Sequence, residues 1–152
     1  MTAREVTELL KRGFALVQRT KYREAIVLFE RALRLDPKNV EGWSLRAAVL
    51  IDMERYNEAL ASSDRALALD QNFADAWSKR GLALYNMSRF NEALEACTRA
   101  LALNANDVTT WYVKGICLDE LGRENEAQEA YAKSLELEII LDMDAERRRS
   151  RK

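Results

Sequence analysis

Apolar residues recur along the chain at intervals of three and four, the spacing that places them on one face of an α-helix. One such stretch runs from Trp77 to Leu84, and the next runs from Leu94 to Leu101. The strict alternation of apolar and polar residues that is typical of strands is absent. The breaks between stretches are short and polar, so we expect consecutive helices to be antiparallel neighbours.

A period of 34 residues organises the pattern, because Trp43, Trp77 and Trp111 are separated by 34 residues each. A fixed period of this length indicates a stack of equivalent supersecondary units. The same register aligns four alanines that each follow a glutamate: Ala25, Ala59, Ala93 and Ala127 after Glu24, Glu58, Glu92 and Glu126. The period predicts four helical hairpins, at residues 6–39, 40–73, 74–107 and 108–141.

Helix ends are marked by particular residues. Pro37 cannot continue a helix, and Asn39 and Asp107 are placed to cap the helices that follow them. The remaining residues divide into a lead-in at 1–5 and a helix extension with a basic tail at 142–152.

A glycine position recurs inside the first helix of the repeats, at Gly13, Gly81 and Gly115. Glycine there costs about 1 kcal/mol relative to alanine. Ala47 fills the same position in the second repeat, which indicates a need for small size and not for positive φ. We therefore expect two helices to approach closely at this position.

The last helix is predicted to extend beyond its repeat, with Leu137, Ile140 and Leu141 on one face. No other segment of this chain is available to cover that face. Two hypotheses follow: the chain is one piece of a longer protein, or the face pairs with a second copy in a homodimer. Leu137, Ile140 and Leu141 are the candidate residues for self-association.

Composition fits a helix-rich globular protein, with 48% hydrophobic residues, 32% charged residues and a single proline. No run of 18 apolar residues occurs, and the first residues are charged where a signal peptide would be apolar. A cytoplasmic protein that does not bind membranes is expected. Five of the last six residues are basic although the net charge is −1; the acidic body argues against nucleic acid as the partner of this tail.

The residue types that catalysis and metal binding need are scarce. The chain has no histidine, which removes the commonest general base and metal ligand. No glycine lies in a phosphate-cradling motif, and Cys97 and Cys117 lie in apolar helical contexts typical of reduced core residues. We expect no enzymatic activity, no metal and no cofactor.

The third repeat resembles the tetratricopeptide repeat, through Trp77, Arg80, Gly81, Leu84, Ala93, Cys97 and Ala100. The resemblance covers residues 6–141. It implies an all-α, right-handed superhelical solenoid of four antiparallel hairpins, or eight helices, whose first helices line a concave groove. Members of the family use this groove to hold a peptide or a helix, so a protein-interaction scaffold or adaptor is expected.

Co-chaperones of this family grip a terminal carboxylate with basic and amide side chains, at positions that correspond here to Leu10, Phe14, Leu45, Asp75 and Lys79. Only Lys79 is basic, so the resemblance does not extend to this carboxylate clamp. An apolar or basic peptide fits the expected groove better. The candidate groove residues are Phe14, Ser44, Ala48, Asp52, Ser78, Lys79, Tyr85, Asn86, Tyr112 and Asp119.

Two alternatives stay open at this point. Some of the apolar groove residues could pack on one another instead of binding a ligand. The chain could also be a structural, self-associating module that makes its contacts through the uncovered face of the last helix.

Overall fold

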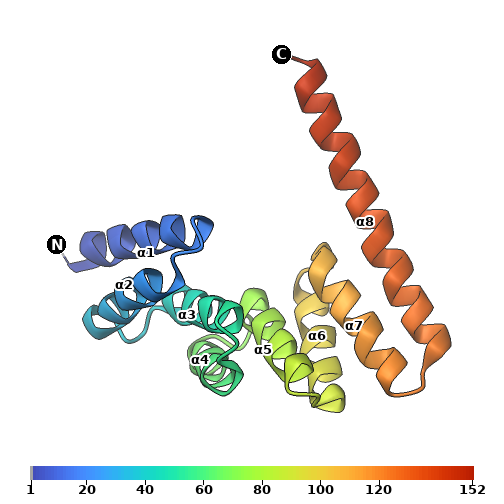
Figure 1. Cartoon of the computed structure of the whole chain (residues 1–152), viewed down its shortest axis with the longest axis horizontal. Coiled ribbons are helices and arrows are strands. Elements are labelled where there is room, and N and C mark those ends of the chain that lie inside the picture. The colour runs from blue at the N-terminus through green and yellow to red at the C-terminus, as the bar shows by residue number, and fades with distance from the viewer. Residues whose placement is uncertain (1) are drawn as a thin grey trace.

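The computed structural model describes residues 2–152, which form eight α-helices and no strand (Figure 1). The prediction of an all-α solenoid of paired helices is confirmed. The helices are α1 (Thr2–Gln18), α2 (Tyr22–Leu35), α3 (Val40–Asp52), α4 (Tyr56–Leu69), α5 (Ala74–Asn86), α6 (Phe90–Leu103), α7 (Val108–Glu120) and α8 (Glu124–Ser150).

The turn inside each hairpin repeats one backbone motif. In each turn one residue adopts a left-handed conformation. These residues are Thr20, Glu54, Ser88 and Gly122, with φ of 58°, 59°, 58° and 75°. The amide of the next residue then donates to a leucine carbonyl five residues back, as from Lys21 to Leu16 at 2.9 Å and from Arg123 to Leu118 at 2.8 Å. This bond satisfies a carbonyl at the end of the first helix and reverses the chain.

The turn between repeats depends on a short polar side chain at its first residue. Asp36, Asp70 and Asn104 each accept a hydrogen bond from the amide two residues later, at 3.2, 3.0 and 3.1 Å. Such bonds favour a turn over a helix. The predicted caps are also present, because Asn39 accepts from the Gly42 amide at 2.7 Å and Asp107 from the Thr110 amide at 3.1 Å.

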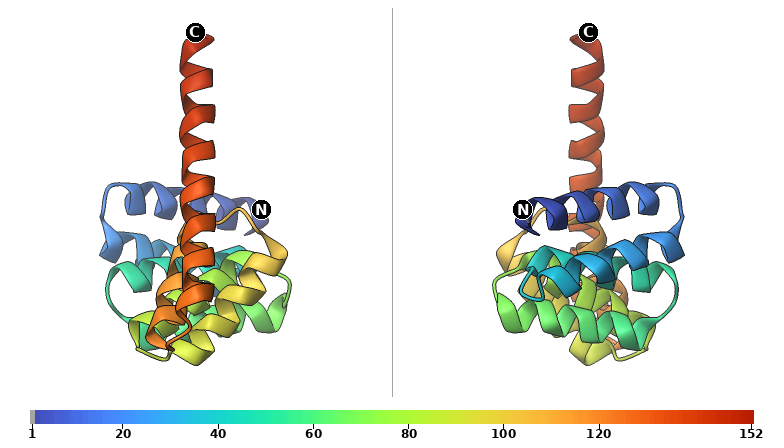
Figure 2. Two further views of the ribbon diagram at one scale, coloured as in Figure 1. Left: turned by 90° about the vertical axis from the view of Figure 1, so that its right-hand side faces the viewer. Right: turned by 90° about the vertical axis from the view of Figure 1, so that its left-hand side faces the viewer.

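The fourth repeat has no such turn, and α8 continues as predicted. Glu138 stands where the earlier repeats have Asp36, Asp70 and Asn104, and it is followed by Ile-Ile-Leu. These residues lack the short side chain that would compete with the helix. As a result α8 has 27 residues, whereas α6 has 14, and its second half projects beyond the other helices (Figures 1 and 2).

The two helices of a hairpin pack closely at the glycine position. A Cβ atom at Gly13 would lie 2.4 Å from Cε1 of Phe29, and one at Gly115 would lie 2.5 Å from Cε1 of Tyr131. The close approach expected from the sequence is confirmed. The aligned alanines of the second helices are likewise fully buried: Ala25, Ala59, Ala93 and Ala127.

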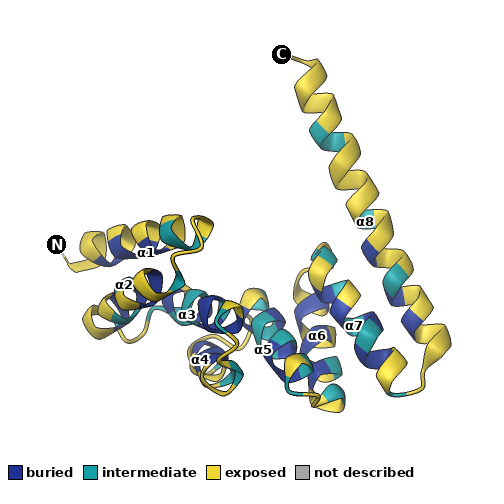
Figure 3. Cartoon of the chain, in the orientation of Figure 1, coloured by how far each residue is buried: buried dark blue, intermediate teal, exposed yellow. Residues whose placement is uncertain are grey.

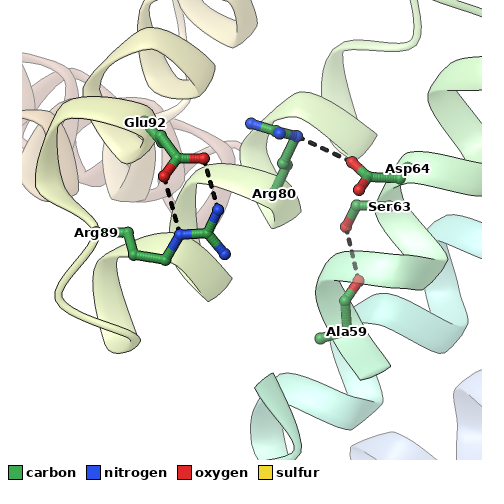
Figure 4. A network of polar contacts seen from close by, with 6 residues as sticks. All are labelled: Ala59, Ser63, Asp64, Arg80, Arg89 and Glu92. Atoms are coloured by element: carbon green, nitrogen blue, oxygen red, sulfur yellow. Dashed lines mark hydrogen bonds and ion pairs between the residues drawn. The ribbon is translucent and has the colours of Figure 1, made fainter. Parts of the chain in front are cut away.

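Neighbouring repeats are joined by polar contacts as well as by the apolar core. Arg80 of α5 pairs with Asp64 of α4 at 2.9 Å (Figure 4), and the equivalent Arg46 of α3 pairs with Glu30 of α2 at 3.2 Å. Each tryptophan also donates a hydrogen bond from Nε1 to the backbone carbonyl six residues earlier, at 2.8 Å: Trp43 to Pro37, Trp77 to Gln71 and Trp111 to Ala105. These bonds anchor the start of each helix to the preceding turn.

Candidate peptide-binding groove

The odd-numbered helices lie on the inside of the curved stack. The odd-numbered helices contact one another in succession, α1 with α3, α3 with α5 and α5 with α7, whereas the even-numbered helices of residues 2–152 do not contact one another. When the helices on one side of a stack contact one another and those on the other side do not, the stack curves toward the side that has the contacts. The odd-numbered helices therefore supply the concave inner surface that the family resemblance implies.

A pocket of about 410 Å³ opens between α1 and α3 at the start of this surface. Its lining includes Leu10, Phe14 and Leu45, together with Lys11 and Glu41. The Phe14 side chain is 50% exposed at this site. A large aromatic ring beside an apolar depression can anchor an apolar side chain of a partner.

The structure separates the candidate groove residues by exposure. Phe14 and Tyr112 are 50% and 53% exposed, at opposite ends of the inner surface. The polar candidates Asp52, Asn86 and Asp119 are exposed as well, whereas Ala48, Lys79 and Tyr85 are half-buried.

Ser44 and Ser78 are buried, and both hydroxyls are used between repeats. Ser44 Oγ donates to the Asp75 carboxylate at 3.1 Å. Ser78 Oγ lies 3.2 Å from an Asp107 carboxylate oxygen and 2.8 Å from Thr110 Oγ1. These two serines belong to the repeat junctions and not to the exposed inner surface, which corrects the expectation from the sequence.

A cluster of tyrosines forms the C-terminal end of the inner surface. The rings of Tyr112 and Tyr131 lie 5.6 Å apart, and the Tyr131 hydroxyl donates to Asp119 at 2.7 Å. Burial, followed by this hydrogen bond, raises the pKa of Tyr131 to about 12. The candidates from the sequence do not include Tyr131. The signal that could have found it is Gly115, whose missing side chain makes room for the Tyr131 ring.

The inner surface carries charges of both signs, with Lys11 and Glu41 at the pocket between α1 and α3. Lys79, the half-buried cation among the candidates, lies 3.8 Å from the Asp75 carboxylate in the same helix. The pKa of Asp52 is raised by partial burial, an effect that Lys79 opposes. Asp52 and Asp119 leave the surface with exposed carboxylates near its apolar side chains.

The two thiols are poor nucleophiles. Burial raises the pKa of Cys97 to about 12 and that of Cys117 to about 11, so little reactive thiolate exists at neutral pH. Both lie in the core, as the sequence predicts. None of the helices within residues 2–152 is both long enough and apolar enough to cross a membrane.

Three models of the tetratricopeptide repeat match the chain, at residues 16–82, 74–107 and 108–138. The chain belongs to the tetratricopeptide repeat family. This agrees with the resemblance seen in the sequence and with the hairpins of the structure. Tetratricopeptide repeat domains are typically modules for protein–protein interaction, and the family is generally non-enzymatic.

Solved structures of the same architecture include a crystal structure of MamA, which is 24% identical with a TM-score of 0.78 and covers 91% of this chain and 81% of that one. MamA from Desulfovibrio magneticus RS-1 is 25% identical with a TM-score of 0.77, over 90% and 77% of the chains. The first tetratricopeptide repeat domain of Spaghetti (RPAP3), bound to the HSP90 peptide SRMEEVD, is 24% identical with a TM-score of 0.75, over 78% and 94%. No match to a curated protein was found.

Proposed function

We propose that this tetratricopeptide repeat protein is a scaffold or adaptor that binds an apolar or basic peptide or helix along its concave surface. The observation that carries the proposal is the pair of half-exposed aromatic rings, Phe14 and Tyr112, on inner helices that also carry the exposed acids Asp52 and Asp119. Aromatic side chains in partly apolar surroundings dominate the binding energy of many interfaces. Asp52 and Asp119 would attract the basic residues of such a partner.

A peptide that ends in acidic residues is a poor candidate. The Spaghetti domain is bound to such a peptide, SRMEEVD. In this chain the positions that correspond to the family's clamp include Leu10, Phe14 and Leu45, which carry no charge. Lys79 is the one basic residue in the set, and Asp75 already lies beside it.

Binding of two synthetic helical peptides tests the proposal. One peptide has leucine on one face and lysine on the other, and the second has glutamate in place of lysine. We expect the lysine peptide to bind, with an affinity that falls as salt is added, and the glutamate peptide to bind far more weakly. Fluorescence anisotropy at two salt concentrations measures both.

Substitutions on the two sides of the stack locate the site. Tyr112→Ala should weaken binding of the lysine peptide about tenfold or more, as expected for an aromatic hot spot. Leu103→Ala is the matched control, because Leu103 is 44% exposed on the outer helix α6. Circular dichroism checks that both variants remain folded. Equal binding of the two peptides, or loss with Leu103→Ala alone, would contradict the proposal.

Self-association is the second candidate function. Ile140 and Leu141 are 46% and 56% exposed in the projecting half of α8, and Leu137 is half-buried beside them. Apolar side chains gathered on one helix mark an interaction surface more often than isolated ones do. A homodimer through α8 would cover them. Buried, reduced cysteines fit the cytoplasmic location that we propose for either function.

A further inference from the structure

The exposed half of α8 includes a surface that the other repeats keep covered. At the same repeat position, Leu33 of α2 and Leu101 of α6 are 7% and 6% exposed and Leu67 of α4 is half-buried, whereas the equivalent Leu135 is 58% exposed. The first helix of the following repeat is what covers this leucine: a Cβ atom at Gly42 of α3 would lie 3.0 Å from Cδ2 of Leu33. Leu135 thus marks the face on which a further helix would pack.

This face continues along α8 as Leu135, Ile139 and Met143, which we call the end stripe. The three residues are four positions apart, so they lie on one side of the helix. Their exposed fractions are 58%, 51% and 50%. Figure 3 shows the C-terminal half of α8 almost entirely exposed.

The first helix of a second copy is a poor fit to the end stripe. The position that packs on the preceding repeat is small and buried in the inner repeats: Gly42, Ala76 and Thr110. The equivalent residue of α1 is Glu8, and burying its unpaired carboxylate would be costly. Head-to-tail stacking of copies is therefore disfavoured.

The C-terminal half of α8 from a second copy fits the end stripe when the two helices are antiparallel. Successive helices in this fold are antiparallel, so a helix that packs on the end stripe in the same way must run opposite to α8. Charge favours the same direction. A parallel pair would set Arg147, Arg148 and Arg149 against their own copies, whereas an antiparallel pair would bring them to the acidic first half of α8, near Glu129.

We propose that two copies of this chain pair through the C-terminal halves of α8, antiparallel, with Ile139 on the two-fold axis. Ile139 then packs on Ile139 of the second copy, and Leu135 packs on Met143. Each α8 takes the place of the helix that would follow it in a longer stack. The proposal keeps self-association through α8 but places it on a different face of the helix from Leu137 and Leu141. It does not depend on binding in the concave groove.

The geometry predicts which engineered cysteines form disulfides between copies. Disulfide formation needs Cα atoms closer than about 7 Å. In the antiparallel pair the two Ile139 residues face one another, whereas the two Leu135 residues lie about 12 Å apart along the axis at 1.5 Å per residue. The native Cys97 and Cys117 are buried and do not compete.

The test uses three single variants of the full chain under mild oxidation: Ile139→Cys, Leu135→Cys and Met143→Cys. We expect Ile139→Cys to give a covalent dimer. Leu135→Cys alone and Met143→Cys alone should give almost none, but an equimolar mixture of these two should give a mixed dimer. Non-reducing gels and mass spectrometry measure the yields.

Other patterns would overturn the proposal. Covalent dimers from all three single variants, with no preference for the mixed pair, would show a parallel arrangement. No covalent dimer from any of them, together with a monomer mass for the unmodified protein by light scattering, would show that the end stripe does not pair. Neither result affects binding of the lysine peptide. Failure of the pairing proposal is therefore distinguishable from failure of groove binding.

Discussion

At the residue scale, the size of one side chain in the first helix is matched to its neighbour in the second. Gly13 faces the ring of Phe29, and Gly81 faces the sulfur of Cys97. The second repeat has Ala47 at the glycine position and Ser63 at the position of Cys97, and both are fully buried. The chain thus contains its own example of a larger residue accepted beside a smaller one.

This matching predicts coupling between Gly81 and Cys97. A Cβ atom at Gly81 would lie 2.7 Å from Cys97 Sγ, so Gly81→Ala should lower the free energy of unfolding by about 1–3 kcal/mol through overpacking. Adding Cys97→Ser should recover part of the loss, with a coupling energy of about 0.5–3 kcal/mol. Urea denaturation of the single and double variants measures it.

A control separates packing from helix propensity. Ala47→Gly should lower the free energy of unfolding by about 1 kcal/mol, the intrinsic cost of glycine in a helix. If Gly81→Ala instead raises stability by a similar amount, the glycine position is not set by close packing.

At the scale of the element, each hairpin depends on one residue in the left-handed region. Gly122 supplies it without strain, whereas Thr20, Glu54 and Ser88 adopt it against the preference of L-residues. No atom lies within 4 Å of a Cβ built at Gly122. A substitution there therefore acts through the backbone alone.

Exchanging residues between two of these turns should shift stability in opposite directions. Gly122→Ser should lower the free energy of unfolding by about 1–2 kcal/mol, the cost of the left-handed conformation for an L-residue. Ser88→Gly should raise it by less, because glycine loses more backbone freedom on folding. Thermal and urea melts followed by circular dichroism measure both, and a loss of stability with Ser88→Gly would contradict the account.

The elements were predictable from the sequence to a greater extent than the site. The 34-residue period, Pro37 and the capping residues Asn39 and Asp107 act locally, so their effects could be read from the chain. Ser44 and Ser78 have the right spacing for the inner surface, but the next repeat covers them. Whether a side chain is covered depends on how closely successive repeats pack, which no local pattern contains.

At the scale of the whole molecule, the concave surface and the end stripe are separate surfaces. Repeats in a solenoid contact mainly their neighbours, so a change at one end has little effect on the other surface. Phe14 lies in the first repeat and Ile139 lies in the projecting half of α8. The two surfaces can therefore be tested independently.

If the two surfaces are independent, one variant should lose pairing alone and another should lose peptide binding alone. Ile139→Glu should give a monomer that still binds the lysine peptide, because the charge disrupts only the pairing of α8. Phe14→Ala should remain a dimer with weakened binding, because Phe14 lies in α1, which does not contact α8. Light scattering and anisotropy on the same samples measure this, and loss of both properties in either variant would show that the surfaces are coupled.

We propose that the inner surface formed by the odd-numbered helices binds the peptide ligand. The most direct measurement is a titration of isotope-labelled protein with the lysine peptide, followed through the amide signals in NMR spectra. We expect shifts concentrated in α1, α3, α5 and α7, with the largest around Phe14 and Tyr112. Shifts concentrated in α2, α4 and α6 would contradict it.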